Sequence, residues 1–199
     1  TRYSGKLELF TRVNVIFFQK TTSIERNGHH PLLRITQVDV VEVFPQLKIE
    51  FNKIVGASYI AEFLNRVFEE YDHTHSAVYV LVCNTFRTLA TSENLRSILP
   101  AFEIKLLAHL GYAPILDHCI GCGKPRSAVA SQSHGGKKDS AFQRLNSEFL
   151  GFSSASGGIL CQRCKSFQKD VLDITSQSVD LLQQFLTTEM PQIPAIAIP

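Results

Sequence analysis

Four cysteines in two close pairs are the residues of this sequence whose types and spacing best fit a chemical role. Each pair has the form Cys-x-x-Cys: Cys119 with Cys122, and Cys161 with Cys164. Such a turn presents two thiolates on one side of a short loop, and two turns together supply the four sulfur ligands of tetrahedral Zn²⁺. Gly123 follows the first pair and can take a positive φ as the turn closes. The pattern predicts one structural Zn²⁺ held by all four cysteines.

The same four residues allow other interpretations, namely two disulfides, a redox-active Cys-x-x-Cys, or a coincidence of spacing. Residues 123–160 separate the pairs, which exceeds the roughly 15–20 residues of the simplest zinc sites of this type. The excess falls in residues 127–147, which are rich in Ser, Gln, Gly and Lys, so we expect a flexible insertion at the tip of the module. His118 and His134 lie nearby, but four sulfurs already complete the ligand shell.

Composition is typical of a globular protein. The chain has 199 residues, of which 44% are hydrophobic and 19% charged, unlike a disordered sequence. No apolar run approaches the roughly 18 residues of a membrane span. Cys83, the one cysteine outside the two pairs, lies in an apolar run and is expected to be a buried core thiol. This cysteine usage favours a reducing, cytoplasmic location.

Charge is unevenly distributed along the chain, although the net charge is only +2. Residues 1–40 hold six basic and three acidic groups, and residues 124–169 hold eight basic and two acidic groups. The intervening residues 41–123 are net acidic, with six basic and nine acidic groups. Positive charge gathered at the amino-terminal segment and around the cysteines is typical of a polyanion-binding surface. Chance segregation on an ordinary solvated surface is the alternative.

Hydrophobic periodicity divides the chain into a β part and a helical part. Apolar residues alternate through residues 7–17 and, after a polar turn, through residues 33–40, which predicts about three antiparallel strands. Beyond Pro45 the period becomes helical, and helices are predicted at residues 51–68, 76–91, 95–110 and 175–187. The proline-rich tail, residues 191–199, is predicted to be irregular. The fold class is therefore α+β.

Catalytic motifs are not found in the sequence. There is no GxSxG, P-loop, GxGxxG or HExxH pattern. His73 and His75 beside Asp72 are better explained as a polar interhelical turn than as a metal or base site. We therefore do not expect an enzyme.

A resemblance to a known family is carried by residues 102–123, FEIKLLAHLGYAPILDHCIGCG. This run resembles the bacterial RecO recombination mediators, which have F-E-x-x-L-L followed by L-G-Y-x-P-x-L-x-x-C-x-x-C-G. Their second half, F-S-x-x-x-G-G-x-x-C-x-x-C, is met from Phe152 to Cys164. Upstream, Tyr3-Ser4-Gly5 with Leu9-Phe10, and then residues 41–45, are similar to the end of the family's OB-fold. The resemblance covers nearly the whole chain.

The resemblance implies how the chain is organised. Residues 1–45 would be the C-terminal part of an OB-fold, residues 46–116 a helical domain, residues 117–168 the four-cysteine zinc module, and residues 169–199 a C-terminal helix and tail. It also implies that two OB strands precede residue 1 and that a further helix follows residue 199. On that comparison, we expect the chain to be truncated at both ends.

The resemblance also implies a function, that of a non-enzymatic, nucleoid-associated DNA-repair mediator. Such proteins bind single- and double-stranded DNA and anneal complementary strands. With RecR they promote RecA loading on DNA coated by single-strand-binding protein (SSB), whose acidic and apolar C-terminal tail they contact. A zinc-stabilised interaction module for an acidic partner peptide is the alternative function.

Candidate binding residues follow from charge and resemblance together. Basic side chains would contact phosphates, and exposed aromatic rings of the sheet would stack on bases. The predicted phosphate contacts are Lys6, Arg12 and Arg34 on the sheet, and Lys124, Arg126, Arg163 and Lys165 near the zinc. The stacking candidates are Tyr3, Phe10, and Phe17 or Phe18. The candidates for the SSB tail are Arg87, Arg96 and Lys105.

Overall fold

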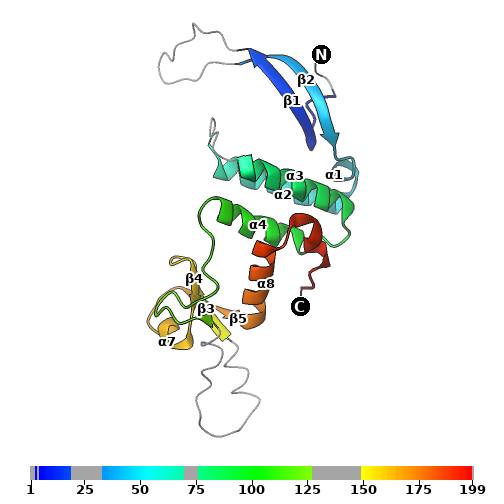
Figure 1. Ribbon diagram of the computed structural model, residues 1–199. Helices are drawn as coiled ribbons and strands as arrows, with labels where there is room; N and C mark the ends of the chain where they lie inside the picture. Colours follow the sequence, from blue (N-terminus) through cyan, green and yellow to red (C-terminus); the bar gives the residue numbers. More distant parts are fainter. Residues whose placement is uncertain (1–2, 4, 19–32, 70–75, 127–148, 199) are drawn as a thin grey trace, which may run out of the picture. The chain divides into compact units, whose positions relative to one another are not determined.

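The computed structural model describes residues 3, 5–18, 33–69, 76–126 and 149–198, and its fold is α+β, as predicted (Figure 1). The chain divides into two compact units. Unit 1 comprises residues 1–70 and 89–93, and unit 2 comprises residues 71–88 and 94–199. None of the helices formed by the described residues has the length and apolar character that crossing a bilayer requires.

Unit 1 contains a two-stranded antiparallel sheet followed by helices. Strand β1 (Thr11–Phe18) pairs with β2 (Arg34–Val43), and the two strands run side by side as a curved ribbon (Figure 1). Val38 of β2 is almost fully buried, whereas most other side chains of the ribbon are exposed. The short helix α1 (Gln46–Ile49) and the longer α2 (Phe51–Val67) follow.

The strand predicted around Leu7 and Leu9 is not formed. These residues lie in an exposed turn, in which the Lys6 N–H donates to the Tyr3 carbonyl at 3.1 Å. Phe10 takes φ +52°, a left-handed conformation that interrupts an extended strand. Alternation was therefore misleading here, and the ribbon has two strands rather than three within the described residues.

A buried lysine ties the start of α2 to the end of α3 (Ser76–Thr91) within unit 1. The Lys53 side chain is 5% exposed, and its Nζ donates to the Ala90 carbonyl at 3.0 Å. The same Nζ lies 2.8 Å from Glu50 Oε2, so the charge is paired as well as hydrogen-bonded. This pairing compensates the cost of burying an ammonium group.

Unit 2 places α4 (Ile98–His109) against α8 (Ser176–Thr187) and the 3₁₀ helix η1 (Met190–Ala195). The tail was predicted to be irregular, and that prediction was wrong over η1. Met190 and Ile193 are buried, and Pro191 stands in the first turn of η1, where a missing N–H costs no helical hydrogen bond. Burial of these apolar side chains against α4 orders the segment.

A second sheet, which the hydrophobic pattern does not predict, supports the cysteines. Its antiparallel strands are β3 (Phe149–Ser153), β4 (Gly158–Leu160) and β5 (Val171–Thr175), in the order β4-β3-β5. The sheet and α8 share one core, built around Leu116, Leu150, Ile159 and Val179. Thr175 begins α8, its Oγ1 accepting from the Ser178 N–H at 3.0 Å.

Candidate metal centre and nucleic-acid interface

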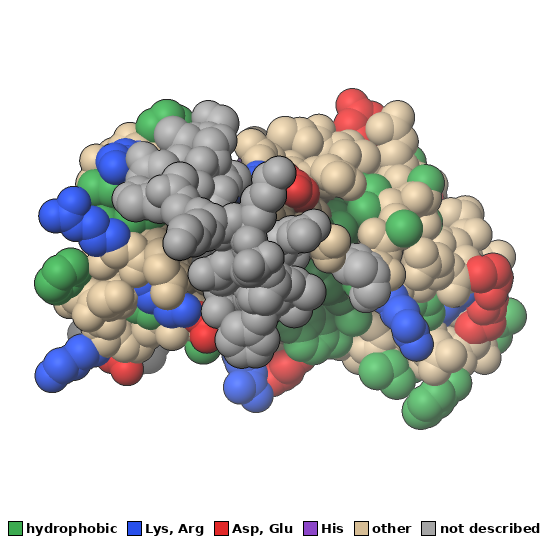
Figure 2. All heavy atoms as spheres, turned by 90° about the horizontal axis from the view of Figure 1, so that it is seen from below, with side chains coloured by type: hydrophobic (Ala, Val, Ile, Leu, Met, Phe, Trp, Pro, Cys, Tyr) green, Lys and Arg blue, Asp and Glu red, His purple; other side chains and the backbone are tan. Residues whose placement is uncertain are grey.

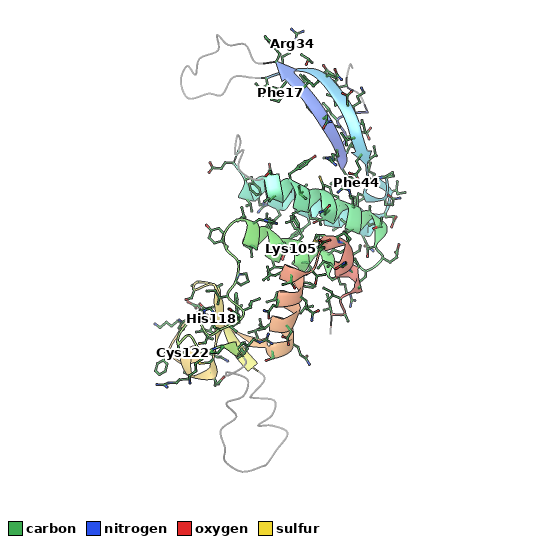
Figure 3. The ribbon with its side chains drawn as sticks, viewed as in Figure 1. Phe17, Arg34, Phe44, Lys105, His118 and Cys122 are labelled. Carbon is green, nitrogen blue, oxygen red and sulfur yellow. The ribbon has the colours of Figure 1, made fainter. Side chains whose placement is uncertain are left out.

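The two cysteine pairs come from loops that are joined by backbone hydrogen bonds. Cys119 and Cys122 lie on one loop, whereas Cys161 directly follows β4 and Cys164 lies in the short helix α7 (Gln162–Lys165). The Ile120 N–H donates to the Ile159 carbonyl at 3.0 Å, which fastens the first loop to β4. Figure 3 shows Cys122 and His118 in this part of unit 2, which we call the cysteine module: residues 115–126, the sheet β3–β5 and α7.

The four sulfur atoms form one cluster. All four Sγ atoms lie within 4.8 Å of one another, and those of Cys122 and Cys161 are 3.9 Å apart. A disulfide requires about 2.05 Å, and all four cysteines are free thiols here. A tetrahedral site with metal–sulfur distances of about 2.3 Å has edges of about 3.8 Å. The four cysteines could therefore hold a metal ion, and the disulfide interpretation does not fit this geometry.

Hydrogen bonds and burial act differently on Cys119 and Cys164. Burial alone would raise the pKa of Cys119, but N–H donors of Cys161, Gly121 and Cys122 outweigh it and lower the pKa to about 6. The Cys161 N–H lies 3.2 Å from the Cys119 sulfur. Burial and the neighbouring thiols raise the pKa of Cys164 to about 12. Four thiolates at this spacing therefore require a cation among them.

Two glycines permit the close approach of the loops. Gly123 takes φ +71°, as its place after Cys122 predicts, and its N–H donates to the Cys119 carbonyl at 2.8 Å. At Gly158, an added Cβ would lie 2.8 Å from the Ile115 carbonyl oxygen and 2.6 Å from a methyl carbon of Ile120. Any larger residue at position 158 would push the first loop away from β4.

The histidine considered beside the cluster has a different partner. His118 Nδ1 lies 2.7 Å from Asp117 Oδ1, and this hydrogen bond lowers the pKa of the Asp117 carboxyl group. His118 is not part of the four-sulfur group. His134, the insertion at residues 127–147, and Asp72, His73 and His75 lie outside the described residues.

One end of the ribbon carries an exposed cation and two exposed aromatic rings. Arg34 is exposed and pairs in register with Phe18, next to Phe17 (Figure 3). Both phenylalanines are more than half exposed. Tyr3 and Phe10 are only partly exposed, and the Tyr3 hydroxyl donates to the Ile35 carbonyl.

The remaining predicted ribbon cations have partners within the chain. Lys6 Nζ donates to the Val38 carbonyl at 2.9 Å, and Arg12 Nη1 lies 3.7 Å from Glu42. Both side chains are thus held against β2. Lys6 and Arg34 are exposed, whereas Arg12 is partly buried.

The predicted cations of the cysteine module differ in accessibility. Lys124 and Arg163 are exposed, and Lys165 pairs with Asp173 of β5. Arg126 is the most enclosed, with a side chain 18% exposed. Its Nη2 lies 2.6 Å from Asp180 and donates to the Ser176 carbonyl at 3.0 Å, so Arg126 joins the first loop to α8.

The three residues proposed for a partner tail lie on or beside α3 and α4. Arg87 donates to the Asn84 side chain at 2.9 Å, and Arg96 is exposed in the turn before α4. Lys105 is partly buried, and its Nζ donates to the Leu186 carbonyl at 3.1 Å (Figure 3). Burial lowers the pKa of Lys105, against the opposing charge of Glu189.

Sequence reasoning missed one exposed aromatic residue beside the cysteines. Phe167 lies two residues after the end of α7 and is 83% exposed. Its N–H donates to the carbonyl of Cys164 at 3.2 Å. An available signal was the segment of residues 161–170, in which this single aromatic stands among three basic residues and one acidic residue.

Comparisons with known proteins relate this sequence to one family. The family described as "Recombination protein O C terminal" matches residues 50–199. Over 198 residues the chain is 26% identical to the DNA repair protein RecO of Pelotomaculum thermopropionicum, covering 100% of this chain and 65% of that protein. It is 24% identical over 185 residues to the RecO of Symbiobacterium thermophilum, covering 93% and 63% of the two chains.

A third relative, the DNA repair protein RecO of Roseiflexus sp. (strain RS-1), is 27% identical over 183 residues, covering 92% of this chain and 54% of that protein. This chain thus spans less than two thirds of the length of these three relatives. The family match covers well over half of this chain, including α2 and everything that follows. The chain therefore belongs to the RecO recombination protein family.

Proposed function

We propose that this chain binds DNA as a non-enzymatic recombination mediator in DNA repair. The observation that carries the proposal is the four-sulfur cluster, framed by exposed basic side chains, within the region that matches the RecO family. The relatives are named DNA repair proteins. A cluster of this kind stabilises a small surface module and leaves no open position for catalysis.

The metal we propose is one structural Zn²⁺ held by Cys119, Cys122, Cys161 and Cys164. Zinc favours four sulfur ligands in a closed tetrahedron, and the 3.9 Å sulfur separation fits its edge. When bound, the ion would supply folding energy and draw α7 against the first loop. The predicted division into an OB part at residues 1–45, helices at 46–116, the module at 117–168 and the C-terminal segment belongs to the same proposal.

DNA would meet two groups of cations, one in each unit. Arg34 pairs in register with Phe18 on the ribbon, and this combination of a charge and an exposed ring suits a single strand. Arg163 is the exposed arginine of α7. Both would contact phosphates, without reading sequence. Lys6, Arg12, Lys124, Arg126 and Lys165 are the further predicted contacts.

The partners in this proposal are those that the family resemblance implies. RecR and the SSB tail would bind directly, and RecA would benefit indirectly. For the tail, the candidates are Arg87, Arg96 and Lys105 in unit 2. The cytoplasm and nucleoid are the proposed location.

A salt series with a labelled single-stranded oligonucleotide tests the DNA-binding proposal. Phosphate contacts release counterions, so log affinity should fall linearly with log salt concentration. An Arg34→Ala, Arg163→Ala double variant should lower the slope by about two, since each lost phosphate contact lowers it by about one. Arg66→Ala is the matched control, because Arg66 is an exposed arginine of α2 paired with Glu62.

The same salt series with a metal chelator separates the contribution of the ribbon to DNA binding from that of the cysteine module. Removing the metal should weaken the contribution of the cysteine module and leave that of the ribbon. Absence of measurable binding, or binding with no dependence on salt, would overturn the proposal. Binding of an acidic peptide without any binding of DNA would favour the interaction-module alternative.

A further inference from the structure

We propose that Phe167 is a stacking platform for an unpaired base and makes the turn after α7 a contact for single-stranded DNA. We call residues 163–169 the α7 turn. The inference rests on the proposed DNA-binding function and deepens it, because it names a base-contacting residue outside the ribbon. It stands on the exposure of the ring, the fixed backbone that carries it, and the charges that flank it.

The exposure of Phe167 is unusual within the described part of the chain. At 83% it is the most exposed of the large apolar side chains in these residues. A single exposed apolar residue is common on protein surfaces and needs no function by itself. Whether Phe167 has a binding role therefore depends on the backbone and the charges around its ring.

The backbone under the ring is hydrogen-bonded and anchored on the sulfur cluster. The Phe167 N–H donates to the Cys164 carbonyl at 3.2 Å, and the Lys165 N–H donates to the Cys161 carbonyl at 2.9 Å. Both acceptors belong to residues of the four-sulfur cluster. The ring is thus presented by a fixed turn, and a preorganised contact loses less entropy on binding than a mobile one.

The charges around the ring favour a polyanion. Arg163 and Lys169 are exposed on either side of it in sequence, while Lys165 is engaged by Asp173. Figure 2 shows Lys and Arg side chains standing out next to exposed hydrophobic side chains at the left margin, the side on which Figure 1 places α7. Flanking cations can hold phosphates while the ring meets a base.

The ligand that combines negative charge with accessible aromatic faces is single-stranded nucleic acid. In a duplex the base faces are covered by their neighbours, so a lone ring cannot stack on them. An apolar peptide side chain gains most from being enclosed in a concave pocket. Because Phe167 is 83% exposed, it does not line a concave pocket for such a side chain. Stacking on a base requires only one accessible face of the ring.

The test measures binding of a fluorescein-labelled oligo-dT to the whole chain and to three variants. Phe167→Ala should weaken binding at least 5-fold and by up to about 150-fold, the range that corresponds to about 1–3 kcal/mol per stacked base. Phe167→Tyr should retain the affinity, because it restores the ring. Tyr112→Ala is the matched control, since Tyr112 is another aromatic of unit 2, 73% exposed, and its removal should change nothing.

An abasic oligonucleotide of equal length and charge shows whether the ring meets a base. Its affinity should be the same for the wild-type chain and Phe167→Ala, and both proteins should show the same salt slope with oligo-dT. Equal losses on the normal and abasic strands would overturn the stacking role. Metal content and thermal melting of Phe167→Ala should match the wild type, because the side chain is exposed.

The chain contains no tryptophan, which allows a direct optical readout. In a Phe167→Trp variant the only indole would stand on the α7 turn, and stacking of a thymine should quench its emission as oligo-dT is added. A Tyr112→Trp variant should show no quenching. Emission of the Phe167→Trp variant that stays unchanged at saturating oligo-dT would overturn the inference.

The outcomes separate this inference from the function on which it rests. Salt-dependent binding that is equal in the wild-type chain and Phe167→Ala would leave DNA binding intact and refute the role of Phe167. Failure of the wild-type chain to bind any strand would refute the proposed function itself. Loss of an acidic peptide, rather than of DNA, in Phe167→Ala would overturn the inference and assign the ring to a protein partner.

Discussion

Replacing Arg126 with alanine should loosen the first cysteine loop from α8 and destabilise unit 2. The guanidinium links these two segments through Asp180, the Ser176 carbonyl and the Gln183 side chain at 3.4 Å. Its side chain is 18% exposed, so water competes weakly for its donors. The loss is therefore expected to exceed that of an ordinary surface ion pair.

The structure sets the magnitude. Hydrogen bonds that involve a charged group contribute about 1.5–3 kcal/mol each. Asp180 is 56% exposed and can be rehydrated once Arg126 is gone, so no buried charge is left unpaired. We expect a net loss of about 2 kcal/mol. For a domain of this size, each kcal/mol lowers Tm by roughly 2–4 °C, which gives about 4–8 °C.

Thermal melting of metal-loaded protein measures this effect, with Arg163→Ala as control. Arg163 lies in the same module, carries the same charge and is exposed, so its removal should change stability by less than about 0.5 kcal/mol. A double-mutant cycle of Arg126→Ala with Asp180→Ala should show a coupling energy between about 0.5 and 3 kcal/mol. Equal Tm values for the two arginine variants, together with zero coupling, would refute the reasoning.

Three further predictions concern the cysteine module and α4. Cys161→Ser should abolish stoichiometric metal binding and unfold α7, because metal binding supplies the folding energy of such modules; metal analysis and circular dichroism check this, and one bound metal per variant chain would contradict it. Gly158→Ala should cost about 1–3 kcal/mol by pressing on the Ile115 carbonyl, and should lower metal affinity in competition with a chromogenic chelator. If the metal affinity and the Tm stay unchanged, the loop that carries Cys119 and Cys122 accommodates the added methyl group without strain, and the prediction is wrong. Burial lowers the pKa of Lys105 below 10.5 in the folded chain. Between that lowered pKa and 10.5 the folded chain binds fewer protons than the unfolded chain, so the stability should rise as the pH increases through this range. In urea unfolding at a series of pH values, Lys105→Met should lack that rise, and identical pH profiles would exclude the effect.

Helices with long apolar periodicity could be predicted from the sequence nearly residue by residue. The segment predicted at residues 76–91 forms α3 with those bounds, and Cys83 is buried within it, as expected. The start of α8 could also be found, because a threonine at the cap is a local signal. The sulfur cluster was predictable for the same reason, since the spacing within each pair constrains where its two thiolates lie.

Features that depend on distant partners could not be predicted in this way. Strands β3 to β5 have only three to five residues each, too few for a clear period, and Phe152 finds its neighbours Ile159 and Leu172 only on pairing. At Leu7 and Leu9 the opposite happens: the apolar residues alternate as in a strand, but the segment forms a turn. The link from Arg126 to Asp180 joins residues that no local pattern connects.

The separation of the two cysteine pairs along the chain has a consequence for synthesis. Cys161 follows Cys122 by 39 residues, so at about 5–20 residues per second a ribosome needs about 2–8 s to add it. During that interval the first pair can offer only half of a ligand shell to any passing soft metal or oxidant. Closure must await Cys164, and Arg126 can engage Asp180 only after that. The module should therefore assemble in a set order: the four-cysteine metal site forms first, and α8 packs against it last.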